Sequence, residues 1–223
     1  MANTFRSERL VYRAIEDNDE DIKFLSSLNQ DSEGRIHFSK ALFKPVNKEH
    51  ARNEAETMRK AFFGAIVCIP ISSEDKDQNA ADAASEILKP IGRLELWKIG
   101  ENLRQHRNTK IAIFISSEYR RKGYGSEAIK WLLNWAFQMA GLHRVGISCF
   151  SYNTGARKLY ERLGFVYEGM ERDSVWYDGE WYGTIFLGML KSEWRARGEK
   201  EKSESGRTTI SIDGWTEAEA DLS

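Results

Sequence analysis

The sequence has little of what marks several specialised classes of protein. It holds two cysteines, three prolines and no apolar run of about 18 residues. A membrane-spanning helix needs such a run, so we expect none. Cys68 and Cys149 belong to no metal-binding or redox motif, and we expect reduced thiols in a cytoplasmic protein.

An excess of charge of one sign is also missing. The chain has 33 basic and 34 acidic residues, a formal net charge of −1. General nucleic-acid binders carry a basic excess, so we expect no nucleic acid as partner, and no membrane. The four histidines lack metal-ligand spacing, which predicts no metal site. The first 21 residues lack the apolar segment of a secretory signal.

What remains is a chain suited to one globular domain. It has 223 residues, of which 41% are hydrophobic, enough for a proper core. We predict a domain over residues 1–197. A polar stretch without periodicity, residues 72–89, is expected to be a flexible hairpin loop within it. Residues 198–223 are expected to be a disordered or loosely docked tail, and the charged residues 195–209 to be disordered.

Periodicity predicts an α/β protein with a mixed sheet of about seven strands and four helices. Strands are expected at residues 9–15, 61–71, 91–99, 111–115, 142–150, 166–174 and 182–191. Helices are expected at residues 22–28 and 48–60, between the turn near residue 123 and Gly141, and after Asn153. Residues 29–34 are expected to form a loop, and residues 36–43 are only weakly periodic. Asp178-Gly179 predicts a tight hairpin.

The stretch at residues 111–165 organises the rest of the chain, because it places a glycine-rich turn between a strand and a helix. Helix starts present unpaired N–H groups and the positive end of a dipole, and Gly123 and Gly125 allow an anion close to them. Arg120, Arg121 and Lys122 add positive charge. This is a candidate pyrophosphate site, although an ordinary turn with solvated charges explains it equally well alone. The turn fits neither a P-loop nor the dinucleotide fingerprint, which disfavours nucleotide binding.

Two linked motifs make this stretch similar to the GNAT superfamily of N-acetyltransferases. The first, Arg/Gln-x-x-Gly-x-Gly/Ala, is met by Arg120, Gly123 and Gly125. The second block is met by Asn153, Ala156, Tyr160 and Gly164-Phe165. The resemblance covers roughly residues 4–194. The runs LGF…EG and DGEWYGT…M resemble the branch with ribosomal-protein N-terminal acetyltransferases and spermidine acetyltransferases.

The resemblance implies a fold and a co-substrate. It implies a central pair of parallel strands, ending near Ile115 and starting near His143, that splay apart to hold the pantetheine arm of acetyl-CoA. It places backbone groups of the first strand against that arm and backbone groups of the turn against the pyrophosphate. The implied acetyl-CoA-binding residues are Phe114, Ile115, Ser116, Arg120, Arg121, Lys122, Gly123, Tyr124, Gly125, Ser126 and Asn153.

Tyr160 is the candidate general acid. By helical spacing alone it is a core aromatic residue, since it shares a helical face with Leu159 and Leu163. The resemblance makes it the acid that protonates the leaving thiolate. A tyrosine with an ordinary pKa of about 10 is protonated at pH 7 and can donate that proton.

The general base is less defined by the sequence. Glu95 lies in the middle of a predicted strand, on the face opposite Leu94 and Leu96, which matches a common arrangement in the family and equally an exposed strand glutamate. Glu171, Asp173 and Asp178 are further candidate carboxylates of the acceptor site. Cys149 is expected to be a structural thiol, because His143 lies too far along the same strand to activate it.

These inferences predict an N-acetyltransferase that moves an acetyl group from acetyl-CoA to a primary amine by direct attack in a ternary complex. The acceptor class stays open between a small amine, a polyamine and a protein N-terminus, and a homodimer is compatible with the sequence. The alternative is a non-catalytic acyl-CoA-binding module. The retained Tyr160 favours the enzyme.

Overall fold

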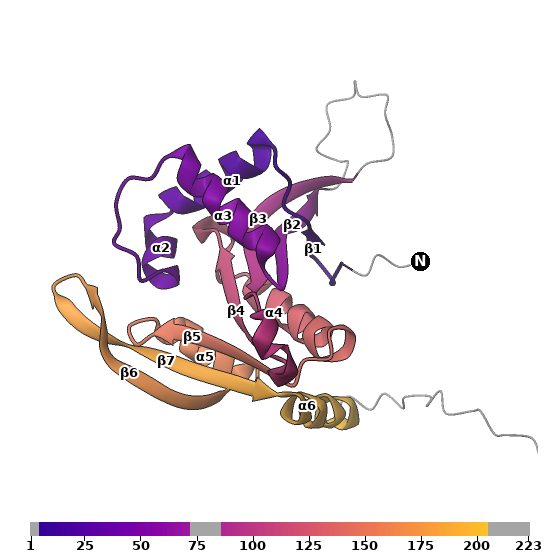
Figure 1. Cartoon of the computed structure of the whole chain (residues 1–223). Coiled ribbons are helices and arrows are strands. Elements are labelled where there is room, and N and C mark those ends of the chain that lie inside the picture. Colours follow the sequence, from indigo (N-terminus) through magenta and orange to yellow (C-terminus); the bar gives the residue numbers. More distant parts are fainter. Residues whose placement is uncertain (1–4, 72–85, 205–223) are drawn as a thin grey trace, which may run out of the picture.

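The computed structural model describes residues 5–71 and 86–204. Seven strands form a sheet in the order β1-β2-β3-β4-β5-β7-β6 (Figure 1). They are β1 Val11–Arg13, β2 Phe63–Ile71, β3 Ile87–Leu96, β4 Asn108–Ile115, β5 Arg144–Phe150, β6 Val166–Tyr177 and β7 Glu180–Leu190. The expected α/β class and seven strands are confirmed. β4 and β5 are parallel, and the other neighbours are antiparallel.

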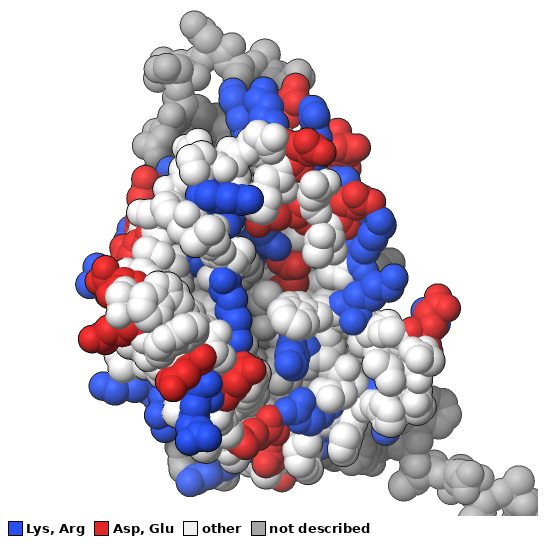
Figure 2. All heavy atoms as spheres, turned by 60° about the vertical axis from the view of Figure 1, so that its left-hand side comes forward, with Lys and Arg blue, Asp and Glu red and all other residues white. Residues whose placement is uncertain are grey.

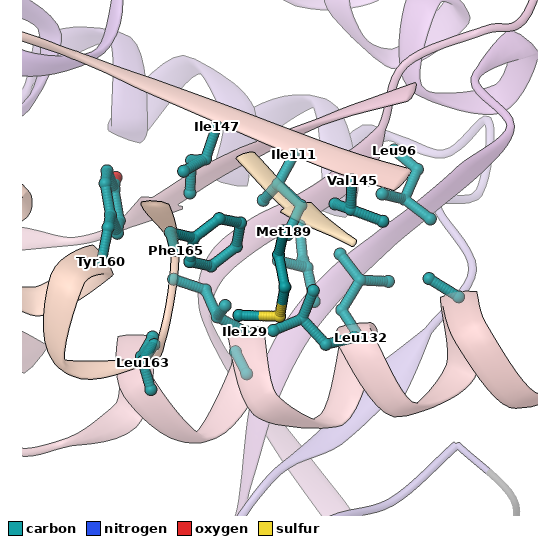
Figure 3. Close-up of a cluster of buried hydrophobic side chains, with 14 of the residues drawn as sticks. Leu96, Ile111, Ile129, Leu132, Val145, Ile147, Tyr160, Leu163, Phe165 and Met189 are labelled. Atoms are coloured by element: carbon teal, nitrogen blue, oxygen red, sulfur yellow. The ribbon is translucent and has the colours of Figure 1, made fainter. Parts of the chain in front are cut away.

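Helices cover both faces of the sheet. The helices are α1 Asp19–Gln30, α2 Ser32–Phe38, α3 Lys48–Lys60, α4 Tyr124–Asn134, α5 Thr154–Arg162 and α6 Lys191–Glu204. Buried residues of α1 and α3 form one core with β1, β2 and Phe114. Buried residues of α4 and α5 form a larger core on the other face, which Figure 3 shows in part. No helix within the described ranges is long and apolar enough to cross a bilayer.

Two of these six helices were not predicted. The expected loop at residues 29–34 is wrong except at Asp31, because α1 runs to Gln30 and α2 begins at Ser32. Asp31 is the N-cap of α2, and its side chain accepts from the Gly34 amide at 2.8 Å. The expected disorder from Arg195 is also wrong as far as Glu204, where α6 ends. Trp194 explains the second error, since its ring packs 5.6 Å from that of Phe137 in the core.

The two hairpins flank the centre of the sheet. β2 and β3 pair as far as Ile71↔Ile87, so the loop expected at residues 72–89 is three residues too long at its end, because residues 87–89 belong to β3. Residues 72–85 of that prediction, and residues 205–223 of the predicted tail, lie outside the described ranges. The predicted tight turn is confirmed, since Asp178 and Gly179 have φ of 49° and 82° between the paired Tyr177 and Glu180.

Candidate active site

β4 and β5 separate after a short parallel contact. They pair only at Asn108↔Arg144, Thr109↔Val145 and Lys110↔Gly146. Beyond it, residues 111–115 of β4 pair with β3, and residues 147–150 of β5 pair with β7. We call residues 111–115 and 147–150 the splayed edges, because within the described chain each has one side without a strand partner. Such an edge can accept an extended chain.

The register decides which backbone groups of β4 face the gap. Trp97 N donates to Lys110 O, and Ser116 N donates to Ile91 O, both at 2.9 Å. Backbone bonds alternate along an antiparallel pair, so Phe114 also bonds toward β3. Ile113 and Ile115 then face the gap. The expectation for the backbones of Phe114 and Ser116 is therefore wrong, and Ile113 was missed because the register is not visible in the sequence.

The glycine turn forms the start of α4. Gly123 is its N-cap, with φ of 86°, and no side chain caps the helix. The first helical bond at this end runs from Glu127 N to Gly123 O at 3.0 Å. The amides of Tyr124, Gly125 and Ser126 therefore have no helical acceptor. Because no side chain occupies these amides, an anion can bind to them directly.

Arg120 joins this turn to α2. Its Nε donates to Ile115 O at 2.9 Å, and its Nη2 lies 3.0 Å from Asp31 Oδ2. A further carboxylate, Glu33, lies 3.6 Å from Nη1. The guanidinium is thus held by the protein. Arg121 and Lys122 stay exposed, with Lys122 Nζ 5.3 Å from the Tyr119 ring.

A cation from the N-terminal segment also reaches the turn, and the sequence reasoning missed it. Arg9 Nη1 donates to Lys122 O at 3.1 Å, and its guanidinium lies 4.7 Å from the centre of the Tyr124 ring. Nε of Arg9 donates to Glu127 Oε2 at 2.8 Å. Burial opposes ionisation of Glu127, yet hydrogen bonds from Arg9 and Ser7 hold its pKa below the ordinary value. Nothing in the sequence spacing connects Arg9 to a turn so far along the chain.

Tyr160 lies on α5 at the margin of the larger core. Asn153 starts this helix as predicted, accepting from Ala156 N at 3.1 Å. The Tyr160 ring packs edge-on against Phe165 at 6.1 Å, and Figure 3 shows its hydroxyl directed away from Leu163. Burial, and to a lesser extent Cys149, raise the pKa of Tyr160 well above 10. The hydroxyl is therefore protonated at neutral pH.

Glu95 lies on the opposite face and is buried, which excludes the exposed alternative. Its Oε1 accepts from Arg93 Nε at 2.7 Å, and Arg93 Nη1 lies 3.4 Å from Glu54 on α3. Glu54 in turn accepts a bond from Asn29. Glu95 is thus one end of a buried polar network under α1 and α3.

The other candidate carboxylates lie on β6 and its turn. Glu171 forms an exposed ion pair with Lys40 at 3.0 Å, and this contact lowers the pKa of Glu171. Asp173 lies in a register irregularity of β6, with φ of 48°, and Asp178 lies in the hairpin turn. Tyr182 donates to Glu180 at 3.0 Å. These carboxylates are spread along the hairpin and do not converge on one point.

Aromatic side chains connect this hairpin to α2. The Tyr152 ring, between β5 and α5, lies 5.1 Å from Tyr177, 4.9 Å from Tyr182 and 5.6 Å from His37. Figure 2, which brings the α2 and β6–β7 side forward, shows a hollow in the middle of this face with charged side chains around it. This face is the candidate acceptor side, opposite α4 and α5.

The two cysteines are buried, and burial raises the pKa of each thiol to about 11. In the described part of the chain, no three His, Cys, Asp or Glu side chains gather where they would hold a metal ion. The arrangement offers an anion site, an open strand edge, a protonated phenol and a hollowed face on the far side.

Comparison with known proteins gives one family. The family model described as "Acetyltransferase (GNAT) domain" matches residues 9–166. The "Putative ribosomal N-acetyltransferase YdaF" of Bacillus subtilis is 35% identical over 43% of this chain and 51% of its own length. The "Spermidine N(1)-acetyltransferase" of Vibrio cholerae is 29% identical over 49% of this chain and 61% of its own length. The match thus spans only part of each of these two relatives.

A solved structure has a similar fold. The spermidine N-acetyltransferase from Vibrio cholerae, in complex with CoA and spermine, superposes with a TM-score of 0.66 at 21% identity. The match covers 85% of this chain and 99% of that one. At this identity the likeness concerns the fold alone.

Proposed function

The chain belongs to the acetyltransferase (GNAT) family, and on that premise we propose that it moves an acetyl group from acetyl-CoA to a primary amine by direct attack in a ternary complex. The observation that carries this proposal is the pair of splayed edges beside an uncapped helix start. An extended arm with an amide-rich backbone and a diphosphate needs both features in one molecule.

The donor site is assembled from backbone groups. The free amides of Tyr124, Gly125 and Ser126 would hold the pyrophosphate, with positive charge from Arg121 and Lys122. The backbone of Ile113 and the amide of Ile115 would bond the pantetheine arm as an added strand does. Arg120 and Arg9 would position the backbone of this site and not contact acetyl-CoA themselves. Arg120 donates to Ile115 O, and Arg9 donates to Lys122 O.

Tyr160 would act on the leaving group. As the amine nitrogen bonds to the thioester carbon, the carbon–sulfur electron pair leaves with sulfur, which takes the Tyr160 hydroxyl proton. The raised pKa supports this role, because it keeps the proton in place at pH 7. General acid catalysis of this kind contributes about 10²–10⁴-fold in rate.

The acceptor is a primary amine, and three classes remain candidates: a small amine, a polyamine and a protein N-terminus. The names of the relatives point to ribosomal proteins and to spermidine. Tyr152, Tyr177 and Tyr182 would offer ring faces to a cationic or extended acceptor.

The test is release of free thiol from acetyl-CoA with a panel of diamines, polyamines, arylalkylamines and N-terminal peptides. We expect amine-dependent release for at least one class, with acetylation of that amine seen by mass spectrometry. Calorimetry with acetyl-CoA alone is run in parallel. Tight binding without release for any amine would instead favour the acyl-CoA-binding module, and absence of both would remove the proposal.

A further inference from the structure

One carboxylate joins α2, on the acceptor side, to the end of the donor strand β4. Oδ1 of Asp31 accepts from the Gly34 amide at 2.8 Å and so caps α2. Oδ2 accepts from the Ser117 amide at 2.9 Å and lies 3.0 Å from Arg120 Nη2. The Asp31 side chain is only 10% exposed. Asp31 and Ser117 are 86 positions apart in the sequence, so the contact depends on the fold.

Arg120 extends this contact to the splayed edge of β4. Its Nε donates to Ile115 O at 2.9 Å, while its Nη2 bonds Asp31. The guanidinium is therefore fixed at two points, one on each element. Ile115 is the last residue of the edge, and because Arg120 bonds its carbonyl, its amide remains for an added chain. Asp31 thus holds the backbone at Ile115 through Arg120 and the backbone at Ser117 directly.

The packing of α2 on β4 requires a residue without a side chain. Gly34 is buried, and a Cβ built there would overlap Nη2 of Arg120 and Cζ of Phe114. The Arg120 guanidinium lies 5.5 Å from the centre of the Phe114 ring, and Phe38 packs edge-on against that ring at 5.4 Å. Glycine in a helix is ordinarily less favourable than alanine. Here it allows the close approach that the Asp31 contacts need.

We propose that Asp31 is a positioning residue for the donor site, whose carboxylate holds the end of the β4 edge where acetyl-CoA binds. This inference rests on the proposed function, in which the Ile115 amide bonds the pantetheine arm. Asp31 acts through Arg120 and the Ser117 amide, and not by contact with the co-substrate. A residue at the start of an acceptor-side helix thereby contributes to donor binding.

The charge of Asp31 gives the proposal a definite sign. Acetyl-CoA carries several negative charges, so removal of a nearby carboxylate would by Coulomb's law alone tighten its binding. It would also free the Arg120 guanidinium to contact a phosphate. A positioning role predicts the opposite, because Arg120 and the Ser117 amide lose their anchor. The direction of the change in affinity therefore separates the two effects.

The experiment measures acetyl-CoA affinity by calorimetry for wild type, Asp31→Asn and Glu33→Gln. Asparagine is a good N-cap, so Asp31→Asn keeps an acceptor for the Gly34 amide and loses the charged contact with Arg120. Glu33→Gln is the matched control, because Glu33 lies 3.6 Å from the same guanidinium but its side chain is 72% exposed. We expect Asp31→Asn to weaken binding by about 10-fold and Glu33→Gln to stay within about 2-fold of wild type.

Gly34→Ala tests the same contact without a change of charge. Alanine favours a helix, so its local effect would stabilise α2, but its Cβ would push α2 away from Arg120. We expect a loss of acetyl-CoA affinity of about 10-fold here too. In both variants kcat at saturating acetyl-CoA should stay within about 3-fold of wild type. A merely structural role for Asp31 would lower the thermal unfolding temperature and leave the affinity of the folded protein unchanged.

The outcomes separate this inference from the proposed function. Tighter or unchanged binding in Asp31→Asn overturns the positioning role, and so does an equal loss in Glu33→Gln. If Asp31→Asn is poorly folded by circular dichroism, unchanged affinity in Gly34→Ala overturns it instead. A wild type that binds acetyl-CoA but acetylates no amine of the panel would remove the proposed transfer and leave the effect of Asp31 on binding in place. A wild type that does not bind acetyl-CoA would remove both.

Discussion

Arg93 and Glu95 lie two residues apart on β3 and form a buried ion pair, with Nη2 of Arg93 2.6 Å from Oε1 of Glu95. The pair lies beneath α3, where Arg93 also meets Glu54 at 3.4 Å. A carboxylate held in this way positions a strand against a helix. It explains why a glutamate on the expected face of the expected strand need not be the residue that takes a proton from the substrate.

Glu95→Gln should therefore affect stability more than chemistry. Breaking a buried pair costs about 3–5 kcal/mol of unfolding free energy when the remaining charge has no other partner. Arg93 keeps its contact with Glu54, so we expect a loss below that range. Turnover per folded molecule should stay within about 10-fold of wild type. Urea unfolding and thiol-release kinetics measure the two quantities. Glu56→Gln, which breaks the exposed pair with Lys60 on α3, is the control and should leave both nearly unchanged. A stable Glu95→Gln protein that is inactive would return the base role to Glu95.

Gly123 and Gly141 allow the anion site to be tested apart from backbone strain. Both have positive φ, 86° and 65°. Gly123 directly precedes α4, and Gly141 follows the π-helical turn Trp135–Met139 that continues α4. An aspartate at either position carries a similar left-handed cost, about 1–2 kcal/mol. We expect Gly123→Asp to weaken acetyl-CoA binding by more than about 10-fold and Gly141→Asp to leave it unchanged. Calorimetry gives the affinities, and thermal unfolding checks that the two losses of stability are comparable.

An equal loss of affinity in both glycine variants would mean that distortion of α4, and not the charge at the turn, controls binding. Unchanged affinity in Gly123→Asp with an intact fold would remove the donor-site assignment. At Gly123 a new Cβ would also lie 3.1 Å from Arg9 Nη2, whereas nothing lies within 4 Å at Gly141. Arg9→Gln is thus a useful third variant, since it clears that contact.

Cys149 and Cys68 should be chemically inert in the folded enzyme. Burial raises both thiol pKa values to about 11, so roughly one thiol in three thousand is ionised at pH 7.5. Mass spectrometry after incubation with acetyl-CoA should find neither cysteine acetylated, and Cys149→Ala should keep kcat within about 3-fold. Cys68→Ala is the matched control in the other core. Stoichiometric acetylation of Cys149 during turnover would contradict direct transfer.

Much of the fold can be predicted from local sequence. Alternating isoleucines, two glycines and a helix-capping Asn153 specify a strand, a turn and two helices through short-range physics, and the structure has them there. Local sequence failed to predict α6, because its charged composition is typical of disorder. The helix forms because the Trp194 ring packs on that of Phe137, with the ring centres 5.6 Å apart. One well-placed apolar side chain thus stabilises the helix despite the charged composition of the residues around it.

The site is less predictable because it depends on register and on distant contacts. The pairing of β4 with β3, and not the motif, turns the Ile113 and Ile115 backbones to the gap. Arg9 reaches the turn through a fold-dependent contact with Lys122. Motifs find the residues near the donor, while three-dimensional packing decides which groups face the acceptor.

Tyr160→Phe separates the core role of this side chain from its proposed chemistry. The ring and its packing on Phe165 remain, so unfolding free energy should change by no more than about 1 kcal/mol. If the hydroxyl protonates the thiolate, kcat should fall by about 10²–10⁴-fold, with little change in the acetyl-CoA dissociation constant. Because the thiolate is a good leaving group, water can partly replace the acid. We therefore expect the fall in kcat at the lower end of this range. Single-turnover measurements ensure that chemistry limits the rate. Tyr167→Phe, at an exposed position on β6, serves as the control.

The pH dependence gives a second, independent test of Tyr160. A general acid works only while protonated, so activity that depends on it is present below its pKa and lost as pH rises through it. Because burial raises that pKa above 10, wild type should show no loss from this group between pH 8 and about 10. The folded state also holds this proton more tightly than the unfolded chain, so its contribution to stability is lost only above pH 10. A Tyr160→Phe enzyme with near wild-type kcat when chemistry limits the rate would move the acid role to an ordered water or a neighbouring side chain.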